Sequence, residues 1–128
     1  MSKLLSGRSV LVIEDEMMVL LNIENVLADV GCTAVSSAAT VRQALALIDA
    51  QAFDVAMLDV NLDGEPSYAV ADALASHGVP FVFSTGYSDP GLGGNYRDRP
   101  VLTKPYRDED LTESLAGLLT NPAAPDSQ

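Results

Sequence analysis

Reactive side chains stand directly after four short apolar segments of this chain. They are an acid pair, a single acid, a hydroxyl and a lysine: Glu14 and Asp15, Asp59, Thr85, and Lys104. The carboxyl ends of parallel strands lie along one edge of an open α/β sheet, where such folds bind their ligands. If the four segments are neighbouring strands, these side chains form one site.

Three of the side chains are carboxylates, and a doubly wound sheet would bring them together. In the strand order 2-1-3-4-5, the ends of the first and third strands meet where the order reverses. Glu14, Asp15 and Asp59 would then repel one another, which calls for a divalent cation. Magnesium fits best, because it prefers oxygen ligands and is commonly bound by one or two carboxylates together with a phosphate.

Groups that can hold a phosphoryl oxygen are expected beside this acid cluster. Thr85 offers a hydroxyl and Lys104 an ammonium group, while Gly86 allows its backbone N–H to approach a ligand closely. A carboxylate nucleophile combined with a metal, a cation and such donors is the arrangement of a phosphoryl-transfer site.

Strand and helix patterns alternate along the chain, as judged from short apolar runs and from apolar residues at helical spacing. The predicted strands span 10–13, 33–36, 54–58, 80–84 and 101–103. The predicted helices have apolar faces within 19–30, 41–48, 70–74 and 111–118. Their expected boundary residues are Gly31, a Thr40–Gln43 capping box, Pro66 in a first turn, Gly78, and Asp108 as a cap.

This alternation predicts an α/β fold, a three-layer doubly wound sandwich of the flavodoxin-like kind. Its five-stranded parallel sheet would have the order 2-1-3-4-5. The segment 88–99 is rich in glycine and also contains proline, so we expect the fourth helix of the fold to be short or disordered there.

Composition narrows the range of partners. The 128 residues suffice for one domain, which we expect over residues 1–120, with a flexible tail at 121–128. The formal charge of −11 would repel a phosphate backbone, so no nucleic-acid partner is expected. No apolar run approaches the roughly 20 residues of a membrane span. We therefore expect a soluble, cytoplasmic protein with no membrane partner.

Each reactive residue also has a simpler explanation when it is taken alone. Asp15 or Glu16 could be the N-cap of the helix that follows, and Asp59 could cap a loop. Lys104 could be a surface charge. His77, the only histidine, is expected to interact with a helix C-terminus and not to be a catalyst. These explanations do not account for the joint placement of the reactive groups at strand ends.

Three motifs resemble the receiver domain of two-component response regulators, and the resemblance spans nearly the whole chain. They are Val-Ile-Glu-Asp-Glu at 12–16, Leu-Asp-Val-Asn-Leu at 58–62 and Leu-Thr-Lys-Pro-Tyr at 102–106. Their order and spacing make the resemblance specific. It implies a signalling phospho-acceptor and not an enzyme, although such a domain assists its own phosphorylation and dephosphorylation.

The resemblance also implies a role for each site residue. Asp59 would accept a phosphoryl group from a sensor histidine kinase or a histidine phosphotransfer protein. Asp15, Asp59 and the backbone carbonyl of Asn61 would bind Mg²⁺, and Glu14 would act mainly through water. The phosphoryl oxygens would be held by four residues: Thr85, Lys104, Gly86 and Asn61.

Within that family, the chain is similar to the subgroup called FAT GUY, found in alphaproteobacteria. The similar segments are Pro-Phe-Val-Phe-Ser-Thr-Gly-Tyr at 80–87 and Leu-Asp-Val-Asn-Leu-Asp-Gly-Glu at 58–65. Ser84 stands where that subgroup usually has alanine. Val101 stands where ordinary receivers have an aromatic ring that reports activation, so the usual threonine–aromatic switch is not expected.

Other functions fit only parts of the pattern. A phosphatase of the haloacid dehalogenase type needs a second aspartate two residues after its nucleophile, and Asn61 cannot act as an acid or base. An FMN carrier would place its phosphate against the acidic residues 14–16, and their negative charge would repel it. A receiver that only docks would not need the complete set of site residues. We therefore expect a single-domain response regulator that binds an unknown downstream protein or drains phosphate from its kinase.

Overall fold

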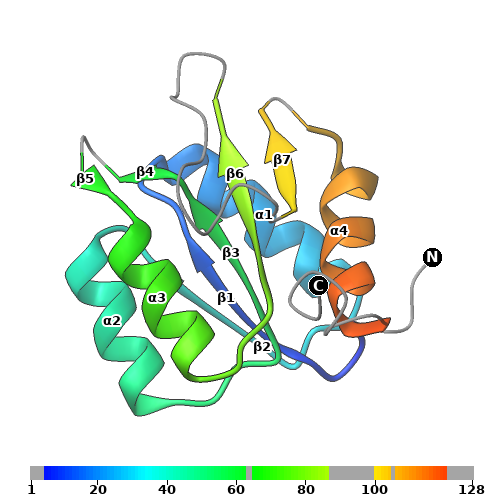
Figure 1. Ribbon diagram of the computed structural model, residues 1–128. Coiled ribbons are helices and arrows are strands. Elements are labelled where there is room, and N and C mark those ends of the chain that lie inside the picture. The colour runs from blue at the N-terminus through cyan, green and yellow to red at the C-terminus, as the bar shows by residue number, and fades with distance from the viewer. Residues whose placement is uncertain (1–4, 63–64, 87–99, 105, 121–128) are drawn as a thin grey trace.

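A five-stranded parallel sheet organises the chain in the computed structural model, which describes residues 5–62, 65–86, 100–104 and 106–120. Figure 1 shows the long strands of this sheet running in the same direction, with helices on both faces of the sheet. In spatial order the strands are β2 (Ala34–Ala38), β1 (Ser9–Ile13), β3 (Val55–Asp59), β6 (Phe81–Thr85) and β7 (Val101–Thr103). The predicted α/β sandwich and the predicted order of its five parallel strands are confirmed.

Four helices are present among the described residues. They are α1 (Met17–Asp29), α2 (Val41–Ala50), α3 (Tyr68–Ser76) and α4 (Asp108–Thr120). Gly31 and Gly78 follow α1 and α3 with φ angles of 89° and 72°, a left-handed conformation that glycine adopts without steric cost. None of the described helices combines the length and the apolar character that a membrane-spanning segment requires.

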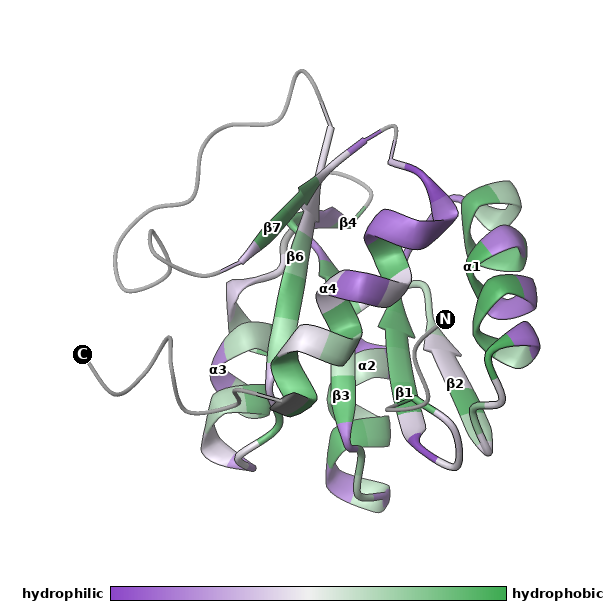
Figure 2. Ribbon diagram, turned by 90° about the vertical axis from the view of Figure 1, so that its right-hand side faces the viewer, coloured by the Kyte–Doolittle hydropathy of each residue, from purple (hydrophilic) through white to green (hydrophobic). Residues whose placement is uncertain are grey.

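The strands are apolar because both faces of the sheet are covered. All five residues of β3 are buried, and β1 is buried from Val10 onward. Successive side chains of a strand point to opposite faces, so the core divides into two clusters. One cluster joins Leu11, Leu58 and Phe83 to α2 and α3, and the other joins residues such as Val12 and Met57 to α1 and α4. In Figure 2 the central strands are green where α4 crosses them.

The capping box before α2 forms as predicted. The hydroxyl of Thr40 accepts a hydrogen bond from the backbone N–H of Gln43 at 3.1 Å. The side chain of Gln43 in turn accepts a hydrogen bond from the N–H of Ala39, at 2.8 Å. Both bonds satisfy backbone donors that a helix start leaves unpaired, so this helix begins at a defined residue.

Two predicted helix starts are wrong. Pro66 was expected in the first turn of α3, but it lies in β5 (Glu65–Pro66), which pairs antiparallel with β4 (Asn61–Leu62). Pro66 fits there because, in a two-residue strand, one missing N–H removes little pairing. Asp108 is the first helical residue of α4 and not its cap, since the N–H of Leu111 donates to the carbonyl of Arg107.

The glycine-rich segment 88–99 and the tail 121–128 lie outside the described residues, and so does the fourth helix expected between β6 and β7. The other predicted elements are present, and the boundaries of the strands differ from the predicted ones by at most two residues. Such differences are within the ordinary uncertainty of element ends.

Replacing Thr40 with alanine should remove the N-terminal cap of α2. We expect the free energy of unfolding to fall by about 0.5–2 kcal/mol, measured by urea denaturation. Arg42→Ala, an exposed substitution in the same turn, is the control and should change stability by less. Equal effects of the two substitutions would contradict a capping role for Thr40.

Candidate functional site

Asp59 is the last residue of β3. Because side chains alternate between the two faces of the sheet along a strand, its place in β3 determines which face its carboxylate lies on. Val55 and Met57 belong to the cluster beneath α1 and α4, so Asp59 lies on the same side of the sheet. On the neighbouring strand, Ser84 is its register partner. Asp59 is only 4% exposed, so its carboxylate depends on partners inside the protein.

The acid cluster predicted from the sequence forms. Glu14 and Asp15 follow β1, the strand next to β3, and each offers a carboxylate oxygen near that of Asp59. The three oxygens lie within 4.8 Å of one another. Glu14 is 2% exposed, and one of its oxygens accepts a hydrogen bond from the N–H of Glu16 at 3.0 Å. Among the described residues, this group of acids could hold a metal ion.

Lys104 supplies the positive charge of the site. Its Nζ lies 2.9 Å from Asp59 Oδ2 and 3.1 Å from Glu14 Oε1. A third carboxylate, that of Glu16, lies 3.6 Å away. The backbone N–H of Lys104 donates to the carbonyl of Thr85 at 2.7 Å, which continues the β6–β7 pairing by one residue. The end of the sheet thus places the ammonium group among the acids.

Burial and charge shift the titration of these groups. Burial raises the pKa of Glu14 to about 7, supported by the charge of Asp59 and opposed by the N–H of Glu16 and by Lys104. Burial alone would lower the pKa of Lys104, but its hydrogen bonds and charge contacts with Asp59 and Glu14 outweigh burial and raise that pKa. The lysine therefore stays charged, whereas Glu14 can take up a proton near neutral pH.

The remaining predicted residues lie around this cluster. Asn61 follows Asp59 closely, and its N–H donates to Asp59 Oδ1 at 3.1 Å. Thr85 ends β6 beside β3, and Gly86 comes directly after it; both are half-buried. All the candidate residues predicted from the sequence are therefore at the carboxyl end of the sheet, and no member of the set lies elsewhere.

Ser67 is a site neighbour that the sequence analysis missed. This residue is completely buried, and its hydroxyl lies 2.6 Å from the carbonyl oxygen of Asp59 and 3.0 Å from that of Val60. A serine before an apolar helical pattern is ordinarily interpreted as a helix cap. Nothing in the spacing indicates that it faces backward toward a strand eight residues earlier.

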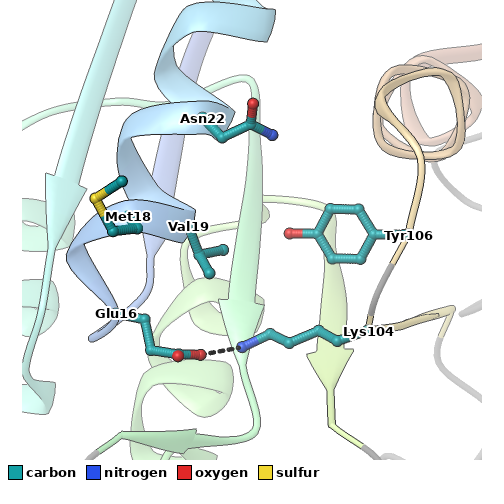
Figure 3. A pocket seen from close by; sticks show the side chains of 6 residues that line it. All are labelled: Glu16, Met18, Val19, Asn22, Lys104 and Tyr106. Atoms are coloured by element: carbon teal, nitrogen blue, oxygen red, sulfur yellow. Dashed lines mark ion pairs between the residues drawn. The ribbon is translucent and has the colours of Figure 1, made fainter.

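A cavity of about 500 Å³ opens beside the acids, between the start of α1 and the segment that leads into α4. Figure 3 shows Met18, Val19 and Asn22 on one side of it and Tyr106 on the other, with Glu16 reaching Lys104. Glu16 holds the N-cap position of α1, which agrees with one of the simpler explanations considered for the acids, but its side chain makes no capping hydrogen bond.

Two buried hydroxyls near this cavity make no hydrogen bond within the described structure: Ser84 Oγ and Tyr106 Oη. Burial raises the pKa of Tyr106 to about 12, with a further contribution from the charge of Glu14. Ser84 has the opposite influence on the phenol and lowers its pKa. The hydroxyl of Ser84 is therefore close enough to the phenol of Tyr106 to affect its pKa, although the two groups do not meet the geometry of a hydrogen bond.

The sequence profile described as "Response regulator receiver domain" matches residues 10–116. The match covers most of the chain and includes the acid pair, Asp59 and Lys104. The protein belongs to the family of response regulator receiver domains, which function in two-component signalling. Among curated proteins, none matches this chain significantly.

Solved structures agree with this assignment. The solution structure of SdrG from Sphingomonas melonis Fr1 is 42% identical, with a TM-score of 0.78, and the match covers 93% of this chain and 99% of that one. The BeF3-activated conformation of SdrG, from Pseudomonas melonis Fr1, is 40% identical with a TM-score of 0.75, covering 89% and 98%. A receiver protein from Sinorhizobium medicae WSM419, 22% identical with a TM-score of 0.77 and coverage of 94% and 98%, shares the fold.

The raised pKa of Glu14 should make the stability of the metal-free protein depend on pH. The carboxyl group has a pKa of about 7 in the folded state and 4.5 in a model peptide. Between these values the folded state binds more protons, so the contribution of Glu14 to the free energy of unfolding falls as the pH rises.

Urea denaturation in the presence of EDTA, repeated across that pH window, tests this dependence. Glu14→Gln removes the titrating group and keeps its size. Wild type should lose stability relative to this variant as the pH increases. A stability difference that stays constant across the window would contradict the raised pKa.

Proposed function

We propose that this chain is a single receiver domain, over residues 1–120, that accepts a phosphoryl group on Asp59. The observation that carries the proposal is the buried carboxylate of Asp59 with Lys104 Nζ at 2.9 Å and two further acids beside it. A carboxylate that only stabilises the fold would not need additional acids around it, because their negative charges repel its own. A site that binds a divalent cation does need such an arrangement.

In the proposed reaction, an oxygen of Asp59 attacks the phosphorus of a phosphohistidine. The new O–P bond gives an acyl phosphate, the N–P bond breaks, and the donor imidazole keeps the electron pair and becomes protonated. Lys104 stabilises the transferred oxygens by its charge, and Thr85 and the N–H groups of Gly86 and Asn61 donate hydrogen bonds to them. Positioning and charge therefore supply most of the catalysis.

The donor set also fits a magnesium ion. Asp15, Asp59 and the backbone carbonyl of Asn61 would hold it directly, and Glu14 would contribute through water, because hard oxygen donors suit this cation. When bound, the ion would neutralise charge that develops on the phosphoryl oxygens. Without a cation, Lys104 is the basic side chain that balances these acids among the described residues.

The phosphodonor would be a sensor histidine kinase or a histidine phosphotransfer protein, in the cytoplasm. The output would be either phosphorylation-dependent binding of a downstream protein or removal of phosphate from the kinase. The relative SdrG has a structure described as a BeF3-activated conformation, which supports a phosphorylation response in a similar chain. The lifetime of the acyl phosphate separates the two outputs, because a phosphate sink turns over quickly and a signalling state persists.

Magnesium should stabilise the folded protein by binding to the acids. At 100 times its dissociation constant, a ligand of the folded state adds about 2.7 kcal/mol to the free energy of unfolding. We expect thermal denaturation to shift upward with millimolar magnesium in wild type and much less in Asp15→Asn. Asp29→Asn makes the same charge change at the exposed end of α1 and should behave as wild type. An unchanged wild-type curve would rule out the metal site.

Phosphorylation should occur at Asp59 alone. After incubation with magnesium and acetyl phosphate, intact-mass analysis should show one added phosphoryl group in wild type and in Asp29→Asn. Asp59→Asn should show none, since an amide is not a comparable nucleophile. Modification of His77 or of a serine in place of Asp59 would overturn the proposed function.

A further inference from the structure

Ser67 occupies an unusual position for a residue at the start of a helix. It is the N-cap residue of α3, yet its side chain makes no capping hydrogen bond. A serine at this position normally accepts a bond from the backbone N–H two or three residues later. Here the hydroxyl donates in the opposite direction, to the carbonyl of Asp59 at 2.6 Å.

A second set of contacts closes the same stretch of backbone. The N–H of Ser67 donates to the carbonyl of Val60 at 3.0 Å, and the Ser67 hydroxyl lies 3.0 Å from that same oxygen. Between these ends, β4 and β5 pair Asn61 with Pro66 and Leu62 with Glu65. On its other side, Val60 is fixed by its N–H, which donates to the carbonyl of Ser84. The backbone that follows Asp59 is therefore held from both directions.

This backbone carries the groups on which the proposed chemistry depends. It sets the direction of the Asp59 carboxylate, and the N–H of Asn61 donates to Asp59 Oδ1 at 3.1 Å. It also carries the carbonyl of Asn61, which would be a direct ligand of magnesium. Misplacing a reacting group by about 1 Å can reduce a rate about 100-fold, so a bond that fixes this stretch affects both binding and transfer.

We propose that Ser67 is a positioning residue of the phosphoryl-acceptor site. Its hydroxyl donates to the carbonyl of Asp59 and does not cap the helix. This bond keeps the acceptor carboxylate and Asn61 in position relative to Glu14, Asp15 and Lys104. This inference rests on the proposed function and adds a residue outside the three receiver motifs.

The chain contains a matched control for this role. Ser84 is another serine beside the site and is 1% exposed, but its hydroxyl makes no hydrogen bond within the described structure. Ser67→Ala and Ser84→Ala therefore remove the same buried atom from two serines beside Asp59, since Ser84 is its register partner on β6. Only the first removes a bond to the acceptor backbone.

The experiment compares both variants with wild type at a temperature where all three are folded. Magnesium affinity is measured by titration calorimetry, and phosphorylation by acetyl phosphate is measured at saturating magnesium. Residues that orient metal ligands typically change metal affinity by about 10–100-fold when they are replaced. We expect Ser67→Ala to weaken magnesium binding at least tenfold and to slow phosphorylation even at saturation, and Ser84→Ala to match wild type.

Two further measurements keep the result decisive. Ser67→Cys keeps a side chain of similar shape with a weaker donor, so it should give an intermediate loss. In the metal-free protein, the backbone amide resonance of Asn61 should shift further in Ser67→Ala than in Ser84→Ala; Val60 is left out of this comparison because its N–H donates to the carbonyl of Ser84. This reading does not depend on phosphorylation.

The outcomes separate the two proposals. If Ser67→Ala lowers only the melting temperature, with wild-type magnesium affinity, phosphorylation rate and Asn61 amide resonance, Ser67 is only a structural residue and the inference fails. Equal losses in both serine variants would also overturn it. If wild type itself neither binds magnesium nor accepts a phosphoryl group, the proposed function fails, and the amide resonance of Asn61 still decides whether Ser67 positions this backbone.

Discussion

The attraction between one ammonium group and two buried carboxylates is the constraint on which the carboxyl end of this sheet depends. Glu14 and Asp59 are almost fully removed from water, and Lys104 lies about as close to each as a hydrogen bond allows. Leaving such a carboxylate buried without a partner is strongly destabilising. The short strand β7 is therefore important for the site, because Lys104 directly follows it and β7 places this lysine beside the two acids.

The same attraction leaves the acids of the site only partly neutralised. Lys104 has three carboxylate neighbours, of which Glu16 is exposed and contributes little in water. The protein holds more negative than positive charge at this point, so a cation or a rearranged lysine changes the local balance. Groups that are strained electrostatically in one state and relieved in another are the usual basis of a switch.

Sequence reasoning predicted the sheet and the acid cluster because both depend on periodicity and topology. The apolar run before Asp59 identified β3, and the doubly wound order placed Asp59 beside Glu14. The roles of Thr85 and Lys104 as contacts of a phosphoryl group remain predictions. The family is established by the match over most of the chain, whereas the narrower subgroup is not.

The parts that could not be predicted depend on contacts that leave no periodic signal. The pairing of β4 with β5 involves two residues on each side, too few for a pattern, and it moved Pro66 out of the expected helix. Serine is a residue type that commonly caps helices, and only the folded structure shows that the hydroxyl of Ser67 donates to the carbonyl of Asp59. Local sequence predicts the role that a residue type most often has, and contacts with distant parts of the chain can give the residue a different role.

The alternation of side chains along β3 has a consequence for how this protein can change over time. Leu58 faces α2 and α3, while Asp59 lies on the side of α1 and α4. A single-residue insertion or deletion within this strand would exchange the two, placing a carboxylate in one hydrocarbon layer and removing it from its lysine. Length variation is therefore expected outside the strands and not within β3, where the position of Asp59 is tied to the packing of both core clusters.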